Sequence, residues 1–289
     1  MSESDFLATM AVRSRERADA ARAQRSQPEL LSLIRELGPA KRLHRSSEGF
    51  DLIAEMKLRS PALGQLRSGD RDNLEQRVTS YAEAGAAAIS VLTEPSRFDG
   101  ALEHLERAAL ALQSDAVPTM RKDFLVDPYQ VLEARAAGAG GVLLILRMLP
   151  MDVLASLFDT ALDHGLFILL EAFDERDVET ATRLIEPRIG LQSTAESGSL
   201  VLLGVNCRDL VSLQVIPGHL EALAPKLPHW LPRVAESGLA TADDASRLAA
   251  AGYDLALVGS ALMSGDHPRD LAAQMLAAGR SAKRSAACS

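Results

Sequence analysis

Residues 132–146 read Leu132-Glu-Ala-Arg-Ala-Ala-Gly138-Ala-Gly-Gly141-Val-Leu-Leu-Ile-Leu146, an amphipathic segment followed by a short apolar run. A glycine directly after an amphipathic segment, such as Gly138, is typical of a helix end, where the chain adopts a left-handed conformation. The apolar run from Gly141 to Leu146 has the length of a buried strand and is far too short to span a membrane. The stretch therefore predicts a helix followed by a strand of a parallel sheet.

The same alternation recurs along most of the chain, because three further amphipathic segments end at Gly85, Gly165 and Gly252. Eight short apolar runs are present, and they lie at Leu52–Met56, Ala87–Leu92, Val117–Met120, Gly141–Leu146, Leu166–Leu170, Val201–Val205, Leu231–Ala235 and Leu255–Val258. Eight such units over about 240 residues favour an α/β fold, the closed (β/α)8 or TIM barrel, which takes about 250 residues. An open, doubly wound sheet is disfavoured, because no Gly-x-Gly-x-x-Gly follows the first run.

The two ends of the chain differ from this repeating part. Residues 1–47 are charged and predict extra N-terminal helices, one beginning near Phe6 and a second that ends at Gly38-Pro39. Residues 279–289 are small and polar, which predicts a disordered tail. We therefore expect a single barrel domain over residues 1–278, with an inserted loop at 185–200 before the sixth strand.

Composition and charge exclude several classes of protein. The 289 residues include 31 lysines and arginines and 39 aspartates and glutamates, so the net charge is −8. Such a chain is not expected to bind nucleic acid or an anionic membrane. Hydrophobic residues make up 47%, which favours a globular enzyme over a disordered chain. With only two cysteines, Cys207 and Cys288, and no basic segment followed by an apolar block at the N-terminus, we expect a cytoplasmic protein.

Polar side chains follow six of the eight runs, at the end where barrel enzymes carry their chemistry. They are Glu55 and Lys57 at the end of the first run, Arg121, Lys122 and Asp123 after the third, Glu171 after the fifth, Asn206 and Arg208 after the sixth, Glu236 and Ser237 after the seventh, and Ser260 after the eighth. Glu55 and Lys57 are two residues apart, so both side chains point into the barrel mouth. Each residue alone is most simply a solvated rim residue or part of a structural ion pair. Their convergence favours an acid/base site, because crowding shifts pKa values.

Small residues follow the seventh and eighth runs, in Glu236-Ser237-Gly238 and Val258-Gly259-Ser260. Backbone N–H groups in such turns can approach an anion, and the start of a helix adds partial positive charge. These two loops form the usual phosphate site of such barrels. The sequence therefore predicts a phosphorylated substrate held at these turns, with Lys57 within reach.

Several stretches resemble the indole-3-glycerol phosphate synthase family over about residues 6–276. They are Ile53-Ala-Glu-Met-Lys-Leu-Arg-Ser-Pro61, Gly85-Ala-Ala-Ala-Ile-Ser-Val-Leu-Thr-Glu94, Arg121-Lys-Asp-Phe124, Asp127-Pro-Tyr-Gln130, Glu133-Ala-Arg-Ala-Ala-Gly138, Gly204-Val-Asn-Cys-Arg-Asp-Leu210, Ala235-Glu-Ser-Gly238 and Leu257-Val-Gly-Ser-Ala-Leu-Met263. The Glu-x-Lys-x-x-Ser-Pro and Arg-Lys-Asp-Phe strings, in this order and at these strand ends, are specific together.

The resemblance implies a ring closure in tryptophan biosynthesis. Its substrate is 1-(2-carboxyphenylamino)-1-deoxyribulose 5-phosphate, which loses CO2 and water to form the pyrrole ring of indole. Lys122 matches the general acid that protonates the sugar carbonyl, and Glu171 matches the carboxylate that stabilises the iminium charge. Lys57 and Glu55 are candidates for the dehydration step, and which of the two serves it is left open.

The other matched positions are expected to bind the substrate. Asn206 and Arg208 match positions that hold it, Arg208 beside the anthranilate carboxylate. Phe124 and Leu143 are expected to wall the aromatic ring, and Glu236 to contact the substrate. The implied phosphate cradle consists of Ser60, Ser237, Gly238, Gly259 and Ser260, with Lys57 nearby. No cofactor and no metal is expected, because the cationic intermediate drives decarboxylation and no His-rich ligand set is present.

The chain departs from the family's usual pattern at two places. Ser60-Pro-Ala-Leu-Gly64 stands where Ser-Pro-Ser-Lys-Gly is usual, so the mobile first loop loses a hydroxyl and a lysine, Ala62 and Leu63 taking their places. Cys207 stands where a second asparagine is usual, and we expect it to face the helices as a core thiol. These changes fit either a tryptophan enzyme or a paralogue that acts on a related aryl-amino sugar phosphate.

Two further readings are disfavoured by the residues present. An enzyme like the phosphoribosylanthranilate isomerases would need an aspartate that the fifth run lacks, and a non-catalytic paralogue would be expected to lose Lys122, Glu171 or Lys57. The six histidines are expected at the surface or at helix ends. The oligomeric state is not fixed by the sequence, and a monomer is favoured.

Overall fold

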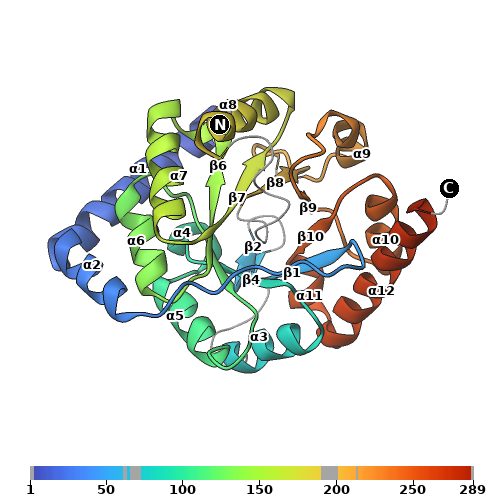
Figure 1. Ribbon diagram of the computed structural model, residues 1–289, viewed down its shortest axis with the longest axis horizontal. Coiled ribbons are helices and arrows are strands. Elements are labelled where there is room, and N and C mark those ends of the chain that lie inside the picture. Colours follow the sequence, from blue (N-terminus) through green and yellow to red (C-terminus); the bar gives the residue numbers. More distant parts are fainter. Residues whose placement is uncertain (1–2, 61–63, 66–72, 190–200, 213, 288–289) are drawn as a thin grey trace.

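Eight strands form one closed parallel barrel in the computed structural model, which describes residues 3–60, 64–65, 73–189, 201–212 and 214–287 (Figure 1). The barrel strands are β1 (Asp51–Met56), β4 (Ala88–Leu92), β5 (Thr119–Lys122), β6 (Gly141–Ile145), β7 (Phe167–Ala172), β8 (Val201–Asn206), β9 (Arg233–Glu236) and β10 (Leu255–Val258). β1 pairs in parallel with both β4 and β10, which closes the sheet. The predicted (β/α)8 barrel is confirmed.

Helices follow the strands and surround the barrel (Figure 1). They are α3 (Leu74–Glu83), α4 (Pro95–Phe98), α5 (Leu102–Ala111), α6 (Pro128–Ala136), α7 (Met151–Asp163), α8 (Glu175–Ile189), α9 (His219–Leu223), α10 (Ala242–Ala250), α11 (Ser260–Ser264) and α12 (Pro268–Ala287), with 3-10 turns at Leu146–Met148 and Ala224–Lys226. Both ends of α6 have residues that favour a helix boundary. Asp127 caps its first turn, and Gly138 after its last turn has φ +86°.

Alternation along each strand divides the apolar residues into two layers. Inward residues such as Ile53, Met120 and Leu169 form a core inside the barrel. Outward residues such as Leu52 and Leu170 pack against the helices. Ionisable side chains are concentrated among the inward positions near the carboxyl ends of the strands, which is the end where barrel enzymes carry their chemistry.

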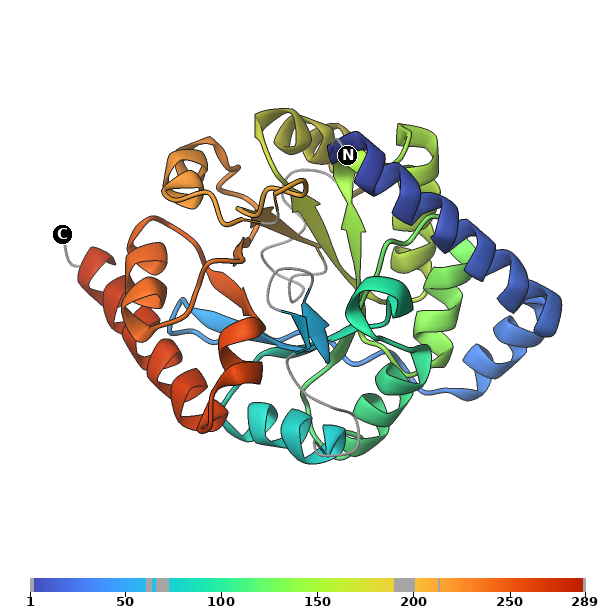
Figure 2. The same cartoon turned by 180° about the vertical axis from the view of Figure 1, so that it is seen from behind.

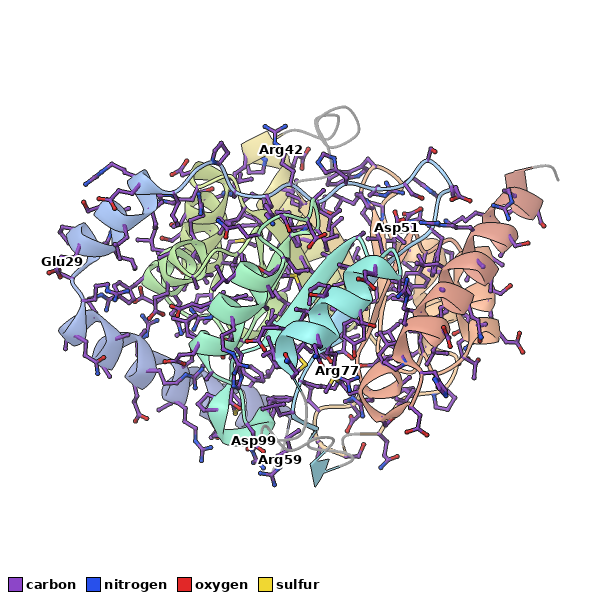
Figure 3. The ribbon with its side chains drawn as sticks, turned by 90° about the horizontal axis from the view of Figure 1, so that it is seen from below. Glu29, Arg42, Asp51, Arg59, Arg77 and Asp99 are labelled. Carbon is purple, nitrogen blue, oxygen red and sulfur yellow. The ribbon has the colours of Figure 1, made fainter. Side chains whose placement is uncertain are left out.

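The N-terminal extension forms two helices, as predicted: α1 (Glu3–Gln24) and α2 (Gln27–Glu36). Figure 2 shows both on one side of the barrel, beside α6, with which they are in contact. A two-stranded sheet of β2 (Arg59–Ser60) and β3 (Gly64–Gln65) was not predicted. Arg59 of this sheet lies 3.7 Å from Asp99, which ends α4, and Figure 3 shows the two side by side at one end of the molecule.

The segment between α2 and β1 closes the other end of the barrel. Leu43 belongs to the interior core and is buried. The ammonium of Lys41 donates to the carbonyl oxygens of Leu112 and Asp115. In Figure 3 the labelled Arg42 of this segment lies at the end opposite to Arg59. The strands therefore open only toward the end that carries β2 and β3.

Two expectations about loops need correction. The chain from residue 279 is not a disordered tail as far as Ala287, because α12 continues through it and Gly279 lies against the ring of Phe50. The first five residues of the inserted loop at 185–200 belong to α8, which contains Pro187, while residues 190–200 lie outside the described part. No helix in the described ranges is both long and apolar enough to span a bilayer.

Candidate active site

A cavity of about 640 Å3 opens at the carboxyl ends of the strands. All eight barrel strands or the residues directly after them contribute to its lining. The predicted residues that line it are Glu55, Lys57, Lys122, Phe124, Leu143, Glu171, Asn206, Arg208, Glu236, Ser237, Gly238, Gly259 and Ser260. Ser60 belongs to β2, and its side chain lies outside the described part. Asp123 lines the cavity as well, but Arg121 does not: its Nη1 donates to the carbonyl oxygen of Gln130 at 2.9 Å, on the side of α6.

Lys122 stands at the centre of the charged half of the cavity. Its ammonium donates to Glu171 Oε2 at 3.0 Å and lies 3.4 Å from Glu236 Oε2. Both carboxylates are buried, Glu171 with 3% and Glu236 with 1% of its surface exposed. An ammonium from β5 and a carboxylate from β7 therefore face each other across a common pocket.

Burial and neighbouring charge set the protonation states of this group. Burial opposes the charged form of Lys122, but the carboxylates of Glu171, Glu236 and Glu55 outweigh it and hold its pKa above the ordinary value. Burial raises the pKa of Glu236 to about 8, with Glu171 and Glu55 acting in the same direction and Lys122 against it. Near neutral pH the site therefore holds a protonated lysine beside a carboxyl group that titrates close to neutrality.

Asn206 connects the charged group to the turn after β9. Its Nδ2 donates to Glu171 Oε1 at 3.0 Å, and its Oδ1 accepts from Ser237 Oγ at 2.9 Å and from the backbone N–H of Arg208 at 3.0 Å. These three bonds fix the orientation of the amide. Both carboxylate oxygens of Glu171 therefore accept a hydrogen bond, Oε1 from the Asn206 amide and Oε2 from the Lys122 ammonium.

Lys57 and Glu55 form an ion pair on the opposite side of the mouth. The predicted orientation of both side chains toward the cavity is confirmed. Gly259 makes room for this pair, because a side chain there would meet the Glu55 carboxylate and the Lys57 ammonium. Gly204 of β8 does the same for Glu236.

The turn after β9 has an unusual backbone conformation. Ser237 has φ +69° and Gly238 has φ +74°, so two successive residues adopt the left-handed conformation. Such a conformation is rare for serine. Both residues, with Gly259 and Ser260 of the next turn, line the cavity.

Aromatic and aliphatic side chains form the rest of the wall. The rings of Phe124 and Phe6 meet edge to face with centroids 5.9 Å apart, and Phe98 lies 6.4 Å from Phe124. Sequence reasoning missed Phe6, Leu7 and Phe98 of this wall, as well as Phe173. Phe173 could have been found, because it lies two residues after Glu171 and so shares its face. The contribution of Phe6 required knowing where α1 packs.

Cys207 faces away from the cavity, as predicted. It is buried among the residues between sheet and helices, and burial raises the pKa of its thiol to about 11. Among the described residues that line the cavity there is no histidine, and no cluster of three or more metal-binding side chains is found in the described ranges.

Comparison with known proteins places the chain among a single group of enzymes. The sequence model of a family described as "Indole-3-glycerol phosphate synthase" matches residues 8–275. Relatives that carry this name include proteins of Salinibacter ruber (38% identical, covering 80% of this chain and 79% of the relative), Mycolicibacterium smegmatis (39%, 80% and 78%) and Nocardioides sp. (40%, 80% and 82%).

Solved structures of more distant proteins share the fold alone. A 3-hexulose-6-phosphate synthase from Salmonella typhimurium superposes with a TM-score of 0.58 at 12% identity, covering 82% of this chain and 99% of that one. A thiamine phosphate pyrophosphorylase from Pyrococcus furiosus gives 0.55 at 16% identity, covering 81% and 98%.

Proposed function

Because the chain belongs to the indole-3-glycerol phosphate synthase family, we propose that the cavity converts 1-(2-carboxyphenylamino)-1-deoxyribulose 5-phosphate into indole-3-glycerol phosphate. The activity is that of a carboxy-lyase of tryptophan biosynthesis. One carbon–carbon bond forms and one breaks, and CO2 and water are released. The observation that carries the assignment of roles is the contact between Lys122 and Glu171 across the pocket.

Lys122 is the general acid of the ring closure. The aromatic carbon attacks the sugar carbonyl, whose oxygen becomes a hydroxyl and must take a proton. Three carboxylates keep the pKa of Lys122 above its ordinary value, so the proton is present at neutral pH. Positioned proton donors typically accelerate such steps by about 10²–10⁴-fold.

Glu171 stabilises the cation that follows ring closure. The anilino nitrogen donates electrons to the ring and becomes an iminium. When the bond between the ring and the carboxyl group breaks, its electron pair returns to the ring and neutralises the iminium, and CO2 leaves. Glu171 is held for this task by Asn206 and Lys122, which fix its two oxygens at 3.0 Å each. A carboxylate placed before the charge develops needs no reorganisation during the reaction.

The ion pair of Lys57 and Glu55 serves the dehydration step. After CO2 leaves, the hydroxyl must depart as water and a proton must be removed from the ring system. Their contact places a proton donor and a proton acceptor at one side of the cavity. We assign the pair together rather than dividing the two roles between its members.

The substrate's two ends have different surroundings in this proposal. The phosphate is held by the backbone at Ser237, Gly238, Gly259 and Ser260, with Ser60 and Lys57 nearby. The aromatic ring lies against Phe124 and Leu143, and Arg208 and Glu236 complete the substrate contacts. The cytoplasm is the compartment we propose, and the barrel acts as one unit with its N-terminal helices and α12, with a monomer as the favoured state.

The test is to mix the purified protein with the carboxyphenylamino-deoxyribulose phosphate and follow indole fluorescence. A rise that depends on the protein supports the proposal, and its absence contradicts it. The same assay with ring-substituted substrates separates the tryptophan enzyme from a paralogue that prefers a modified ring, because only the paralogue would turn over the substituted compound faster.

A further inference from the structure

Asp123, the residue directly after Lys122, holds a saturated buried carboxylate. Its Oδ1 accepts from the backbone N–H of Phe124 at 2.8 Å and from Arg17 Nη2 at 2.7 Å. Its Oδ2 accepts from Thr93 Oγ1 at 2.8 Å, and Arg121 Nη2 lies 3.3 Å away. Asp123 is 4% exposed, so these partners replace water almost completely.

Arg17 reaches Asp123 from α1, more than 100 residues earlier in the chain. Its other terminal nitrogen, Nη1, lies 3.6 Å from the carboxylate of Glu94, which is fully buried. Glu94 in turn accepts from the backbone N–H groups of Ser96 and Arg97 at the start of α4. One guanidinium thus joins the loops that follow β4 and β5, two neighbouring strands of the barrel.

Other contacts of α1 hold the far end of the same loop. Arg15 and Arg22 each lie 2.6 Å from an oxygen of Asp127, the residue that caps α6. Asp127 is four residues beyond Asp123 and therefore further from Lys122. Of these three arginines, Arg17 is the one that binds the loop after β5 at Asp123, the residue next to Lys122.

We propose that Arg17 is a positioning residue, which acts through Asp123 to fix Lys122 and Phe124. Arg17 is not among the described residues that line the cavity, so it has no direct route to the substrate. Without Arg17, the buried carboxylate of Asp123 would keep Arg121 as its cation. A buried charge that is compensated less completely costs stability. Asp123 would turn toward solvent and release the N–H of Phe124. Displacements of about 1 Å at reacting groups can cost about 10²-fold in rate.

This inference rests on the proposed function, and the experiment measures kcat and KM for Arg17→Ala, Arg17→Lys and Arg22→Ala. Arg17→Ala is expected to lower kcat by about tenfold or more, since the acid is misplaced. Arg17→Lys, which restores the charge, is expected to recover most of that loss. Arg22→Ala is the matched control, because it removes an ion pair from the same helix but at Asp127, and its kcat should stay within about twofold of the unaltered protein.

Hydrogen exchange of residues 122–127 gives a readout that needs no turnover. Faster exchange at the Phe124 amide in Arg17→Ala, but not in Arg22→Ala, supports the inference. If kcat of Arg17→Ala stays within about twofold, or if both alanine variants lose activity equally, the positioning role is wrong. An unaltered protein that forms no indole product contradicts the proposed function instead, whereas the exchange at the Phe124 amide still tests whether Arg17 holds this loop.

Discussion

Lys122 carries the largest share of the proposed chemistry at the scale of single residues. Replacing it with methionine keeps the length of the side chain and removes the proton donor. We expect turnover of Lys122→Met to fall by about 10²–10⁴-fold, while substrate binding changes little, because the phosphate turns and the apolar wall stay in place. Product fluorescence and equilibrium titration with substrate measure the two effects. Equal turnover in the variant and the unaltered protein would show that Lys122 is not the acid.

Glu236 leads to a prediction about pH, because burial raises its pKa to about 8 from an ordinary value of 4.5. The unfolded chain releases this proton near pH 4.5, whereas the folded protein holds it up to about pH 8. The folded state therefore binds more protons within this window, and its stability falls as the pH rises. The stabilisation is fully present below pH 4.5 and is lost as the pH passes about 8.

Glu236→Gln removes this titration with little change of shape. The melting temperature of the variant minus that of the unaltered protein is expected to increase from pH 5 to pH 8 and to level off above about pH 9. Thermal unfolding across this range measures the difference. A difference that stays constant with pH would mean that Glu236 titrates at its ordinary value.

At the scale of elements, glycines inside the strands make room for the buried carboxylates. A Cβ at Gly204 of β8 would meet a carboxylate oxygen of Glu236, and the side chain of Leu169 lies 3.0 Å from the same point. We expect Gly204→Ala to destabilise the fold by about 1–3 kcal/mol, the usual cost of overpacking. Activity should fall with it, because Glu236 must move away from Lys122.

Gly38→Ala is the matched control for this change. Gly38 has no atom within 4 Å of its added Cβ and no positive φ, so the same methyl group should leave stability and activity nearly unchanged. Chemical denaturation and kcat measure both variants. If the Gly204→Ala and Gly38→Ala variants are equally stable, the absence of a side chain at Gly204 is not required to accommodate Glu236.

The elements were largely predictable because each carries its own local signal. The apolar runs matched the strands within two residues at every end, and Gly138 marked the end of α6. Contacts between distant segments were not predictable in this way. Phe6 walls the cavity only because α1 packs across the loops after β4 and β5, and no local pattern near Phe6 states where its helix will lie.

The charged site was predictable for a different reason. In a parallel barrel all strands end at one mouth, so the polar residues after the strands must converge once the barrel is recognised. The C-terminal helix shows the limit of this reasoning. Gly279 lies in a small, polar segment that suggests disorder, yet its missing side chain is what lets α12 pass the ring of Phe50.

At the scale of the whole molecule, α12 fastens the closed end of the barrel. Arg280 donates to the carbonyl oxygen of Phe50 at 3.1 Å and to Asp51 at 3.2 Å, and Lys283 donates to Asp254 at 3.1 Å. A chain that stops after residue 278 would expose Phe50 and leave the buried Asp51 without its arginine. We expect it to lose about 3–5 kcal/mol of stability, the cost of breaking a buried ion pair.

A chain that stops after residue 287 keeps all these contacts and is the control. Its melting temperature should equal that of the full chain, and thermal unfolding of both truncations measures the contrast. If the shorter chain is as stable as the control, the last turns of α12 contribute nothing to the barrel.

The distance along the chain between α1 and its partners has a consequence for synthesis on the ribosome. Arg15, Arg17 and Arg22 find their carboxylates 105–112 residues later. At about 5–20 residues per second, these partners emerge roughly 5–20 s after the helix itself. Until then the bridges to Asp123 and Asp127 and the ring contact of Phe6 with Phe124 cannot form. The nascent chain therefore exposes an incompletely assembled segment to chaperones and proteases at its amino end first.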